Sequence, residues 1–465
     1  MRAEGVSAVI VPAARPKRPG RTTPCSDGKG SDIGEGHVLG ENGSHPVVGA
    51  DCQYGPTRQR GSSMKRRILH SAIDKVYNWN NLVVSSRKVV ANKGRAGVDG
   101  MSVERWRLKE EEHLQELRGR LMNDTYRSKP VLRRYIAKAG SRNKRRPLGI
   151  PAVADRVCQQ ACCNVLSPVF EEYFHEDSHG FRLGRSTRTA AKRVESLRKQ
   201  GYRTVVDLDI KDFFGQVDRE ILMRLVKQVV KDRRVLGLLR GWLSAGVMEE
   251  GNLRYQISGT PQGGVVSPML SNVYLTVLDN ALAEHGYKFV RYADDVLILC
   301  RSEQQAAEAL NHARAALGQL KLELNEEKTH ISTFDKGFDF LGFHFGRRGR
   351  TIARKSLKAF YGKVRQTTKR QQGNKPVTAV IQALNPQLRG WANYHLEGRN
   401  VGKFKKLDKW IRKRLRSYIY KRWRVFKGPN ANKPTKEEFE RMGLCSLSKV
   451  IRPGALQLSL FPAPL

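Results

Sequence analysis

Two apolar stretches that contain aspartate constrain the fold of this chain more than any other feature. TVVDLDI (204–210) and RYADDVLIL (291–299) are rich in the branched apolar residues that buried β-strands favour. Because side chains alternate along a strand, Asp207 and Asp209 share one face while Val206, Leu208 and Ile210 share the other. A buried carboxylate is costly unless a neighbouring group compensates its charge. The fold therefore has to bring these aspartates to a compensating group.

The second stretch predicts a tight hairpin with Asp294 and Asp295 at its tip. Aspartate is a common turn residue, so a plain turn is one interpretation. The other is a divalent-metal site, because hard cations recruit carboxylate oxygens. If the two stretches are sheet neighbours, Asp209 joins the pair, and three such close carboxylates raise one another's pKa values unless cations lie between them. Two metal ions about 4 Å apart would satisfy them and would stabilise both oxygens of an in-line phosphoryl displacement.

The charge of the chain indicates the class of its partner. Its 465 residues include 85 Lys and Arg against 44 Asp and Glu, a formal net charge of +41. So many positive side chains repel one another in a folded protein unless a polyanion neutralises them, and nucleic acid is the default polyanion. A membrane surface would also attract the charge, but no apolar run approaches the roughly 18 residues of a spanning helix. Nucleic acid is therefore the predicted partner, and on so basic a chain the aspartates favour the metal site over the turn.

Cysteine usage predicts a reducing compartment. The seven cysteines contain no CxxC pair, and Cys158 and Cys162, spaced i, i+4, have no companion cluster that would complete a metal site. We expect small buried hydrophobic residues here, without disulfides or a zinc module.

Composition divides the chain into five segments. They are a disordered N-terminal extension at 1–63, helices with basic loops at 64–200, strands with helices at 201–345, a basic helical region at 346–427 and a tail at 428–465. Met64 is a candidate functional start. The strand-like runs at 204–210, 255–258 and 287–300 do not alternate regularly with helices, which predicts an α+β fold.

The basic region at 346–427 has 25 Lys and Arg against two acids, Glu397 and Asp408. Within it, KKLDKWIRKRLRSYIYKRW (405–423) spaces its apolar residues by about three and four, which predicts a helix with one apolar and one basic face. A solvated surface helix is the alternative, but dense charge with interleaved Trp and Tyr favours nucleic acid. The residues predicted to contact RNA are Lys405, Lys406, Arg412, Lys413 and Arg416.

Eight motifs follow one another in the order found in one protein family. The first three are NKGRAGVDG (92–100), RRPLGIP (145–151) and HGFRLGRS (179–186). The next five are LDIKDFF (208–214), GTPQGGVVSPMLSNVYL (259–275), YADD (292–295), LNEEKTHI (324–331) and FDFLGFHF (338–345). LNPQLRGWANYH (384–395) and the basic helix come after them. In this order, the chain resembles the reverse transcriptases with a maturase domain that bacterial group II introns encode.

The resemblance implies a right-hand polymerase fold. Residues 64–200 would belong to the fingers, 201–345 to a palm with an antiparallel sheet, and 346–427 to a helical thumb, also called the maturase domain.

The resemblance also implies a catalytic site with two Mg²⁺ ions, at Asp209, Ile210, Asp294 and Asp295. Here the 3′-hydroxyl of a DNA primer would attack the α-phosphate of a deoxynucleoside triphosphate, with Ile210 bordering the nucleotide. Lys328 falls where the family has a lysine that protonates the leaving pyrophosphate. An ordinary exposed lysine is the competing interpretation.

Further nucleotide contacts are implied by position. Phe214 lies where the family places an aromatic steric gate against a sugar 2′-hydroxyl, and Phe213 is expected to pack in the core. Gln262, on a Gly-flanked loop, would touch the incoming nucleotide. Lys138 and Arg146 bracket a basic loop that matches the family's clamp on the triphosphate, with a solvated loop as the alternative.

The chain departs from the family pattern in two places. Gly215 follows the double Phe where the family usually has an acidic or amide residue, although the position flanks the metal site and does not form it. Beyond the thumb only Cys445 is present, so we do not expect the Cys/His-rich endonuclease of larger members. Priming during mobility would then come from elsewhere, such as nascent strands at replication forks.

The leading interpretation is an RNA-directed DNA polymerase that also holds its own intron RNA in the active shape for splicing. Its partners would be that RNA, an RNA template with a DNA primer, and deoxynucleoside triphosphates, in a bacterial cytoplasmic ribonucleoprotein; a homodimer stays open. One alternative is a stand-alone reverse transcriptase of the same lineage, serving repair or phage defence. The other is a splicing factor without polymerase activity, which would have lost an aspartate of the cluster, whereas Asp209, Asp294 and Asp295 are all present.

Overall fold

The computed structural model describes residues 67–137, 145–249, 252–254, 263–369, 375–398, 400–420 and 433–450, all within one compact unit, Arg67–Leu465. The extension at 1–63 and the strand expected at 255–258 lie outside the described residues. The described part is mostly helical with three small sheets, which confirms the α+β prediction. No helix in it is long and apolar enough to cross a bilayer.

The described chain begins with helices that share one large apolar core. They are α1 (Ile73–Val76), α2 (Trp79–Ala91), α3 (Val103–Leu108), α4 (Glu110–Met122) and α5 (Val153–Phe170). Asn78 caps α2 by accepting hydrogen bonds from the backbone N–H groups of Asn80 and Asn81. Cys158 and Cys162 lie fully buried in α5, as their apolar surroundings predict.

A four-stranded sheet stands beside these helices, in the order β2-β1-β4-β5. Its strands are β1 (Val131–Ala137), β2 (Arg145–Ile150), β4 (Val247–Glu249) and β5 (Asn252–Arg254). Strands β1 and β2 form an antiparallel ladder, whereas β1 pairs with β4 in parallel. The intervening chain includes α6 (Thr187–Lys199), α7 (Phe213–Gln216), α8 (Arg219–Val229) and α9 (Arg233–Ser244).

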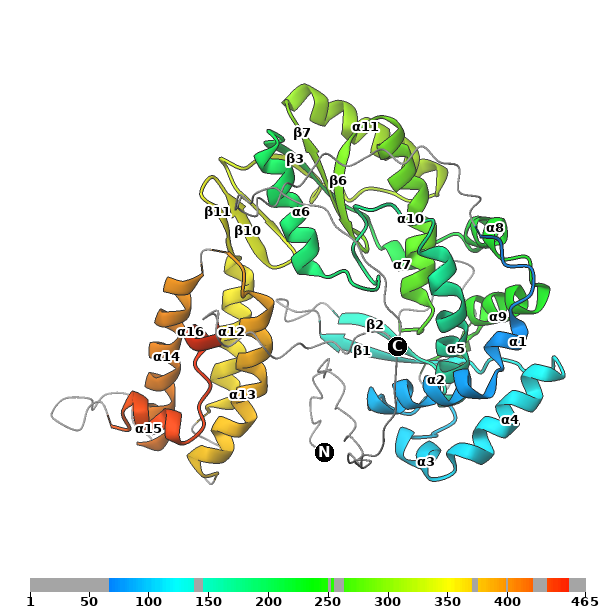
Figure 1. The fold of residues 1–465 in the computed structure, drawn as a ribbon, viewed down its shortest axis with the longest axis horizontal. Helices are drawn as coiled ribbons and strands as arrows, with labels where there is room; N and C mark the ends of the chain where they lie inside the picture. Colours follow the sequence, from blue (N-terminus) through cyan, green and yellow to red (C-terminus); the bar gives the residue numbers. More distant parts are fainter. Residues whose placement is uncertain are drawn as a thin grey trace, which may run out of the picture. The chain divides into compact units, whose positions relative to one another are not determined.

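A second four-stranded sheet, fully antiparallel, carries the aspartate stretches (Figure 1). Its order is β6-β7-β3-β8, with strands β3 (Thr204–Asp209), β6 (Lys288–Tyr292), β7 (Asp295–Cys300) and β8 (His330–Thr333). One face packs on α6, and the other on α10 (Ser267–Glu284) and α11 (Glu303–Gln319). The alternation predicted for β3 is confirmed, because Val205 faces the α6 side while Val206 and Leu208 join the core on the α10 and α11 side.

A three-stranded sheet completes the core on the α6 side. It consists of β9 (Phe338–Phe340), β10 (Phe343–Gly346) and β11 (Gly349–Ile352). The turn between β9 and β10 places both Leu341 (φ 47°) and Gly342 (φ 73°) in the left-handed region. Two such residues make the tightest hairpin connection, which favours Gly and strains Leu.

The last helices form a core of their own. They are α12 (Arg354–Thr367), α13 (Val377–Tyr394), α14 (Val401–Ile419), α15 (Lys436–Arg441) and α16 (Leu447–Val450). Helix α14 buries Leu407, Ile411, Leu415 and Tyr418, which confirms the predicted apolar face. Asp408 is buried too, because its carboxylate accepts hydrogen bonds from the first N–H groups of α16.

Ion pairs tie these helices to the rest of the unit. The buried Arg350 of β11 lies 3.4 Å from Glu195 of α6 and 3.2 Å from Glu397, which follows α13. Lys192 of α6 contacts the other oxygen of Glu397 at 2.9 Å. Burial opposes the ionisation of Glu397, but the bonds to Lys192 and Arg350 outweigh it and hold its pKa below the usual range. The Tyr394 hydroxyl adds a 2.8 Å hydrogen bond to the Leu341 carbonyl in the β9–β10 turn.

Candidate active site

The central sheet brings the two aspartate stretches together, as the sequence predicts. Asp209 lies directly opposite Asp295 in the β3–β7 ladder. Tyr292 also lies opposite Asp295 in the β6–β7 ladder, so Ala293 and Asp294 form a two-residue turn. Residues opposed in this way have Cβ atoms about 5 Å apart. The segment Tyr292–Asp295, called the carboxylate turn below, therefore places Asp294 and Asp295 at the same sheet end as Asp209.

The electrostatics of this sheet end are those of crowded acids. Desolvation by the surrounding protein, followed by repulsion from Asp294, Asp207 and Asp209, raises the pKa of Asp295 to about 6, and Arg146 partly counteracts the rise. Burial likewise raises the pKa of Asp207 to about 6. Because Asp295 still has exposed surface, an ion from solvent can reach it. A bound cation would relieve the repulsion that raises these pKa values.

The segment that follows α11 contacts the other side of Asp209. Lys328 Nζ lies 2.8 Å from Asp209 Oδ1, and the Asn325 N–H donates to the Asp209 carbonyl oxygen at 2.8 Å. The Lys211 N–H donates to the same segment, so backbone hydrogen bonds flank Ile210 on both sides. In an antiparallel pair, a residue that lies between two such backbone hydrogen bonds directs its own carbonyl away from the partner segment. For Ile210 that direction is toward β7. The Ile210 carbonyl is therefore directed to the side of the carboxylates.

These groups fit a hard divalent cation such as Mg²⁺ by their chemistry. Asp209, Asp294 and Asp295 offer carboxylate oxygens and Ile210 offers a carbonyl oxygen, which are the ligands that Mg²⁺ takes in proteins. Among the described residues, no three His, Cys, Asp or Glu side chains are already gathered into a metal-binding group. Lys328 instead supplies a positive charge 2.8 Å from the Asp209 carboxylate. The fit thus rests on the donor types and their shared location, and the ligand roles stay predictions.

The double Phe follows β3 through a residue of unusual backbone conformation. Asp212 has φ 38°, in the left-handed region, and begins α7. Phe213 is buried, as predicted, while Phe214 is only half-buried, with the two ring centroids 5.1 Å apart. The Asp212 carboxylate fills the space that a side chain at Gly215 would need. An acidic group is therefore present beside position 215 although the residue itself is Gly.

The predicted triphosphate clamp is described only in part. Lys138 and Gln262 lie outside the described residues. Arg146 lies in β2 and is close enough to Asp295 to lower the pKa of that carboxyl. Gly263 has φ 115°, and a Cβ there would overlap the Gly149 carbonyl of β2. Gly263 therefore packs against the strand that carries Arg146.

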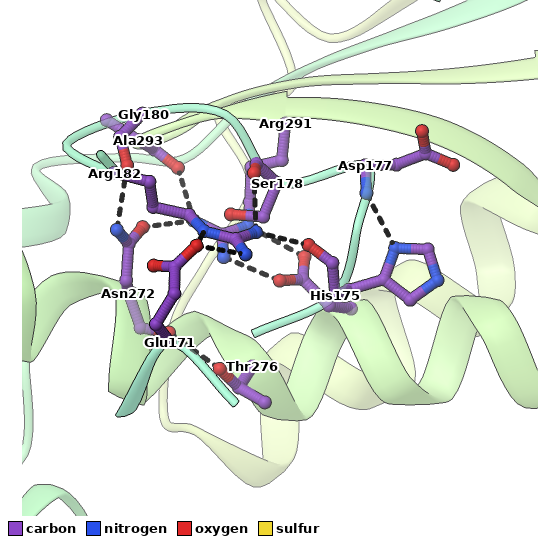
Figure 2. Close-up of polar contacts among 11 residues, drawn as sticks. Glu171, His175, Asp177, Ser178, Gly180, Arg182, Asn272, Thr276, Arg291 and Ala293 are labelled. Carbon is purple, nitrogen blue, oxygen red and sulfur yellow. Dashed lines mark hydrogen bonds and ion pairs between the residues drawn. The ribbon is translucent and has the colours of Figure 1, made fainter. Parts of the chain in front are cut away.

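A buried polar network lies behind the carboxylate turn, and sequence reasoning missed it (Figure 2). Arg291, fully buried, donates to Asp279 on α10 through Nε (2.7 Å) and Nη2 (2.5 Å). Its Nη1 donates to the Asn272 side chain at 2.9 Å and to the Ala293 carbonyl at 3.1 Å. Asn272 and Asp279 are spaced by seven on α10, so they lie on one face of a largely apolar helix, and this spacing was the signal in the sequence.

Tyr394 is a second residue that sequence reasoning missed. It ends α13, and its ring stacks on Phe343 at 5.5 Å between centroids. Burial raises its pKa, and Tyr292 and Asp295 are close enough to raise it further. The GWANYH stretch thus brings a residue of the C-terminal helices within electrostatic reach of the carboxylate turn. Its position at the end of an apolar helix did not indicate that it lies near the carboxylate turn.

The basic face of α14 is only partly free to bind RNA. Lys405, Lys406 and Lys413 are exposed and Arg412 is half-buried. Arg416 instead donates to the Pro434 carbonyl at 3.0 Å, and its guanidinium lies over the Phe439 ring. The structure also exposes a lysine that the prediction omitted, Lys409.

Comparison with known proteins agrees with the site. The family described as "Reverse transcriptase (RNA-dependent DNA polymerase)" matches residues 136–345, and "Group II intron, maturase-specific domain" matches residues 357–435. Protein YkfC of Escherichia coli (strain K12) is 32% identical over 308 residues, which cover 57% of this chain and 80% of YkfC. Group II intron-encoded protein LtrA of Lactococcus lactis subsp. cremoris is 36% identical over 221 residues. These cover 48% of this chain but only 36% of LtrA.

One solved structure matches with a low TM-score. In a "Partial Cas6-RT-Cas1--Cas2 complex", one chain is 25% identical, with a TM-score of 0.34, over 56% of this chain and 43% of that chain. The sequence matches are what define the family. With a reverse transcriptase domain, an RNA-dependent DNA polymerase, followed by a maturase-specific domain, the chain belongs to the group II intron reverse transcriptase/maturase family.

Proposed function

We propose that this chain is an RNA-directed DNA polymerase that also binds the RNA of its own group II intron and assists the splicing and mobility of that intron. The observation that supports the polymerase most is the pairing of Asp209 with Asp295, with Asp294 in the adjoining turn. This pairing lies inside the reverse transcriptase domain, where a metal-dependent polymerase needs its carboxylates.

The architecture of a right hand follows from this proposal. The sheet β6-β7-β3-β8 is the palm, because it carries the carboxylates. The sheet β2-β1-β4-β5 with the N-terminal helices is the fingers, because Arg146 extends from it toward the palm. Helices α12 to α14 are the thumb, within the maturase-specific domain.

Each residue of the site has one task in the reaction. Asp209, Asp294, Asp295 and the Ile210 carbonyl would hold two Mg²⁺ ions, and the bound ions would acidify the primer 3′-hydroxyl and neutralise charge on the departing pyrophosphate. Lys328, whose ammonium already lies at the Asp209 carboxylate, holds a proton within reach of that leaving group.

Substrate selection falls to residues around the carboxylates. Arg146 pairs with the triphosphate, and Lys138 and Gln262 complete the nucleotide contacts in the part of the chain not described. The half-buried ring of Phe214 fills the space that a ribonucleotide 2′-hydroxyl would need.

Replacement of Phe214 by Val should let the polymerase accept ribonucleotides. Removing the ring relieves a steric clash, and a clash of this size discriminates by roughly tenfold to two-hundredfold. The measurement is the ratio of incorporation efficiencies for a deoxynucleotide and its ribonucleotide on one primer. Phe213→Leu is the matched control, because that ring is buried: it should lower stability and leave the ratio unchanged. A ratio equally unchanged in Phe214→Val would remove Phe214 from the gate.

The assistance to splicing rests on binding, since the intron RNA provides its own chemistry. Exposed lysines on α14 lie in the maturase-specific domain and offer phosphate contacts. A folded RNA is recognised mainly by its shape, phosphates and 2′-hydroxyls.

The test of this part is to identify the RNA that accompanies the protein. We would purify the full chain with Asp294→Asn, which is expected to be inert in synthesis, from its native host and sequence the bound RNA. Enrichment of one long structured RNA that contains the reading frame of this protein supports the maturase. A diffuse RNA mixture or an unrelated small RNA would contradict it and leave a stand-alone reverse transcriptase.

A further inference from the structure

Arg291 is the largest fully buried side chain among the described residues, and its partners lie on α10 and in the carboxylate turn. Its guanidinium pairs with Asp279, equally buried, through two parallel hydrogen bonds. The remaining nitrogen, Nη1, contacts both Asn272 on α10 and the Ala293 carbonyl in the carboxylate turn. Every nitrogen of the side chain therefore has a partner, and one of those partners is the turn itself.

Stability alone does not account for this pair. A buried ion pair often stabilises a fold no more than apolar residues of the same volume, because both charges lose their hydration. An apolar residue at 291 could fill the same volume between β6 and α10. It could not donate a hydrogen bond to the turn. The property specific to arginine here is thus the contact with Ala293.

The turn needs such a contact, because its backbone is strained. Ala293 has φ 60°, in the left-handed region that an L residue with a Cβ adopts only at an energetic cost. The strained residue directly precedes Asp294. If the turn relaxed, Asp294 would leave its place beside Asp209 and Asp295.

The backbone of Arg291 also fixes a second element against the turn. The His179 N–H donates to the Arg291 carbonyl at 2.7 Å, and the Arg291 N–H donates to the Asp177 carbonyl at 2.9 Å. The Asn272 amide then donates to the Gly180 carbonyl at 2.8 Å. A Cβ at Gly180 would overlap the Ala293 nitrogen, so the backbone at 180 lies directly on the turn (Figure 2).

We infer that Arg291 is a positioning residue of the polymerase site, which holds the Ala293–Asp294 backbone from behind while Asn272 clamps the Gly180 loop over it. The inference rests on the proposed polymerase function for its consequence in catalysis. The role is indirect, because side chains alternate along β6 and Arg291 therefore lies on the face opposite Tyr292, away from the substrate side.

The matched control is Arg182, which lies in the same segment as Asp177 and Gly180. It is buried too, and it donates to Glu171 through Nε (2.9 Å) and Nη2 (2.7 Å) and to the Ser178 carbonyl at 2.7 Å. Within the described part of the chain, its hydrogen bonds end on Glu171, His175 and Ser178, outside the carboxylate turn (Figure 2). Arg182→Lys therefore disturbs a buried arginine close by without removing the contact with Ala293.

The experiment compares Arg291→Lys, Asn272→Ala and Arg182→Lys in the full chain. Lysine keeps a charge for Asp279 but cannot bond Asp279, Asn272 and Ala293 together. The first readout is Mn²⁺ binding by electron paramagnetic resonance, with Mn²⁺ as the probe for the metal site. The second is hydrogen exchange of peptides that cover residues 292–297, and the third is kcat and KM for nucleotide incorporation.

We expect Arg291→Lys to weaken Mn²⁺ binding about tenfold, the effect of one lost hydrogen bond of ordinary strength, and to speed exchange in the turn. Its kcat should fall by at least as much, with KM for the nucleotide little changed. Asn272→Ala should change the same readouts in the same direction, and it serves as the test if Arg291→Lys does not fold. Arg182→Lys should leave Mn²⁺ binding and turn exchange unchanged even if its melting temperature falls.

Unchanged Mn²⁺ binding and turn exchange in Arg291→Lys and Asn272→Ala would overturn the inference, as would equal changes in Arg182→Lys. These two readouts do not depend on polymerisation. If the unmodified chain extends no primer, the proposed function fails while the positioning role can still be judged from them.

Discussion

Replacement of Asp294 by Asn should abolish DNA synthesis while leaving RNA binding intact. The amide keeps the shape of the side chain but removes the charge that a metal ion requires. We expect the rate of nucleotide incorporation to fall by roughly a thousandfold or more, which corresponds to about 4 kcal/mol of activation free energy. The measurement is single-turnover primer extension on an RNA template, with RNA affinity measured on the same preparation and expected to stay nearly constant.

Asp207→Asn is the matched control for this prediction. Asp207 lies on the same strand and face as Asp209, and its carboxyl, like that of Asp295, has a pKa raised to about 6. It is not among the proposed metal ligands, so its replacement should change the rate by only a few-fold. Loss of RNA affinity in Asp294→Asn without misfolding would contradict the separation of synthesis from RNA binding. Equal loss of synthesis in both variants would contradict the choice of ligands.

The second large effect should come from neutralising the exposed lysines of α14. The variant replaces four of them with Gln: Lys405, Lys406, Lys409 and Lys413. Each lost phosphate contact lowers the slope of log affinity against log salt by roughly 0.7 to 0.9, so four together should lower it by about three. Affinity for the intron RNA at low salt should fall by roughly a hundredfold. The measurement is the dissociation constant over a series of salt concentrations.

A control variant has the same change in net charge at another part of the surface. It tests whether RNA affinity depends on the position of the lysines or only on net charge. It replaces four exposed residues of α8 and α9 with Gln: Arg224, Lys227, Arg233 and Arg240. This variant should keep most of the salt dependence, because α8 and α9 lie outside the maturase-specific domain. An equal loss in both variants would show that RNA responds to net charge alone and would contradict a binding face on α14.

The sequence predicted those parts of the site that depend on regular periodicity. Alternation in β3 correctly placed Asp207 and Asp209 on one face, and the hairpin at Asp294 is a local turn property. The spacing of Leu407, Ile411 and Leu415 likewise predicted the buried face of α14. In each case the signal lies within one element, so no knowledge of the partner was needed.

The contacts that were missed depend on partners from other elements. Arg291 could not be recognised as a support of the turn without knowing that α10 packs beneath β6. The Arg416 guanidinium contacts Pro434 and Phe439 from beyond the end of the helix, which the sequence did not indicate, and its contact with RNA stays a prediction. Asp408 was noted only as one of the two acids in the basic region, and its carboxylate caps α16. Pairings of this kind are set by tertiary packing, which periodicity does not encode.

The double ion pair of Arg350 has a mechanical consequence. One guanidinium contacts a carboxylate from α6, before the catalytic strands, and another from the residue that follows α13. A bending motion at this junction would have to separate both pairs, and would leave a buried charge without a partner. A force applied to the C-terminal helices would therefore be transmitted through β11 to α6 and the sheet that α6 covers, where a compliant hinge would have absorbed it. The Lys192–Glu397 pair and the Tyr394–Leu341 hydrogen bond stiffen the same junction.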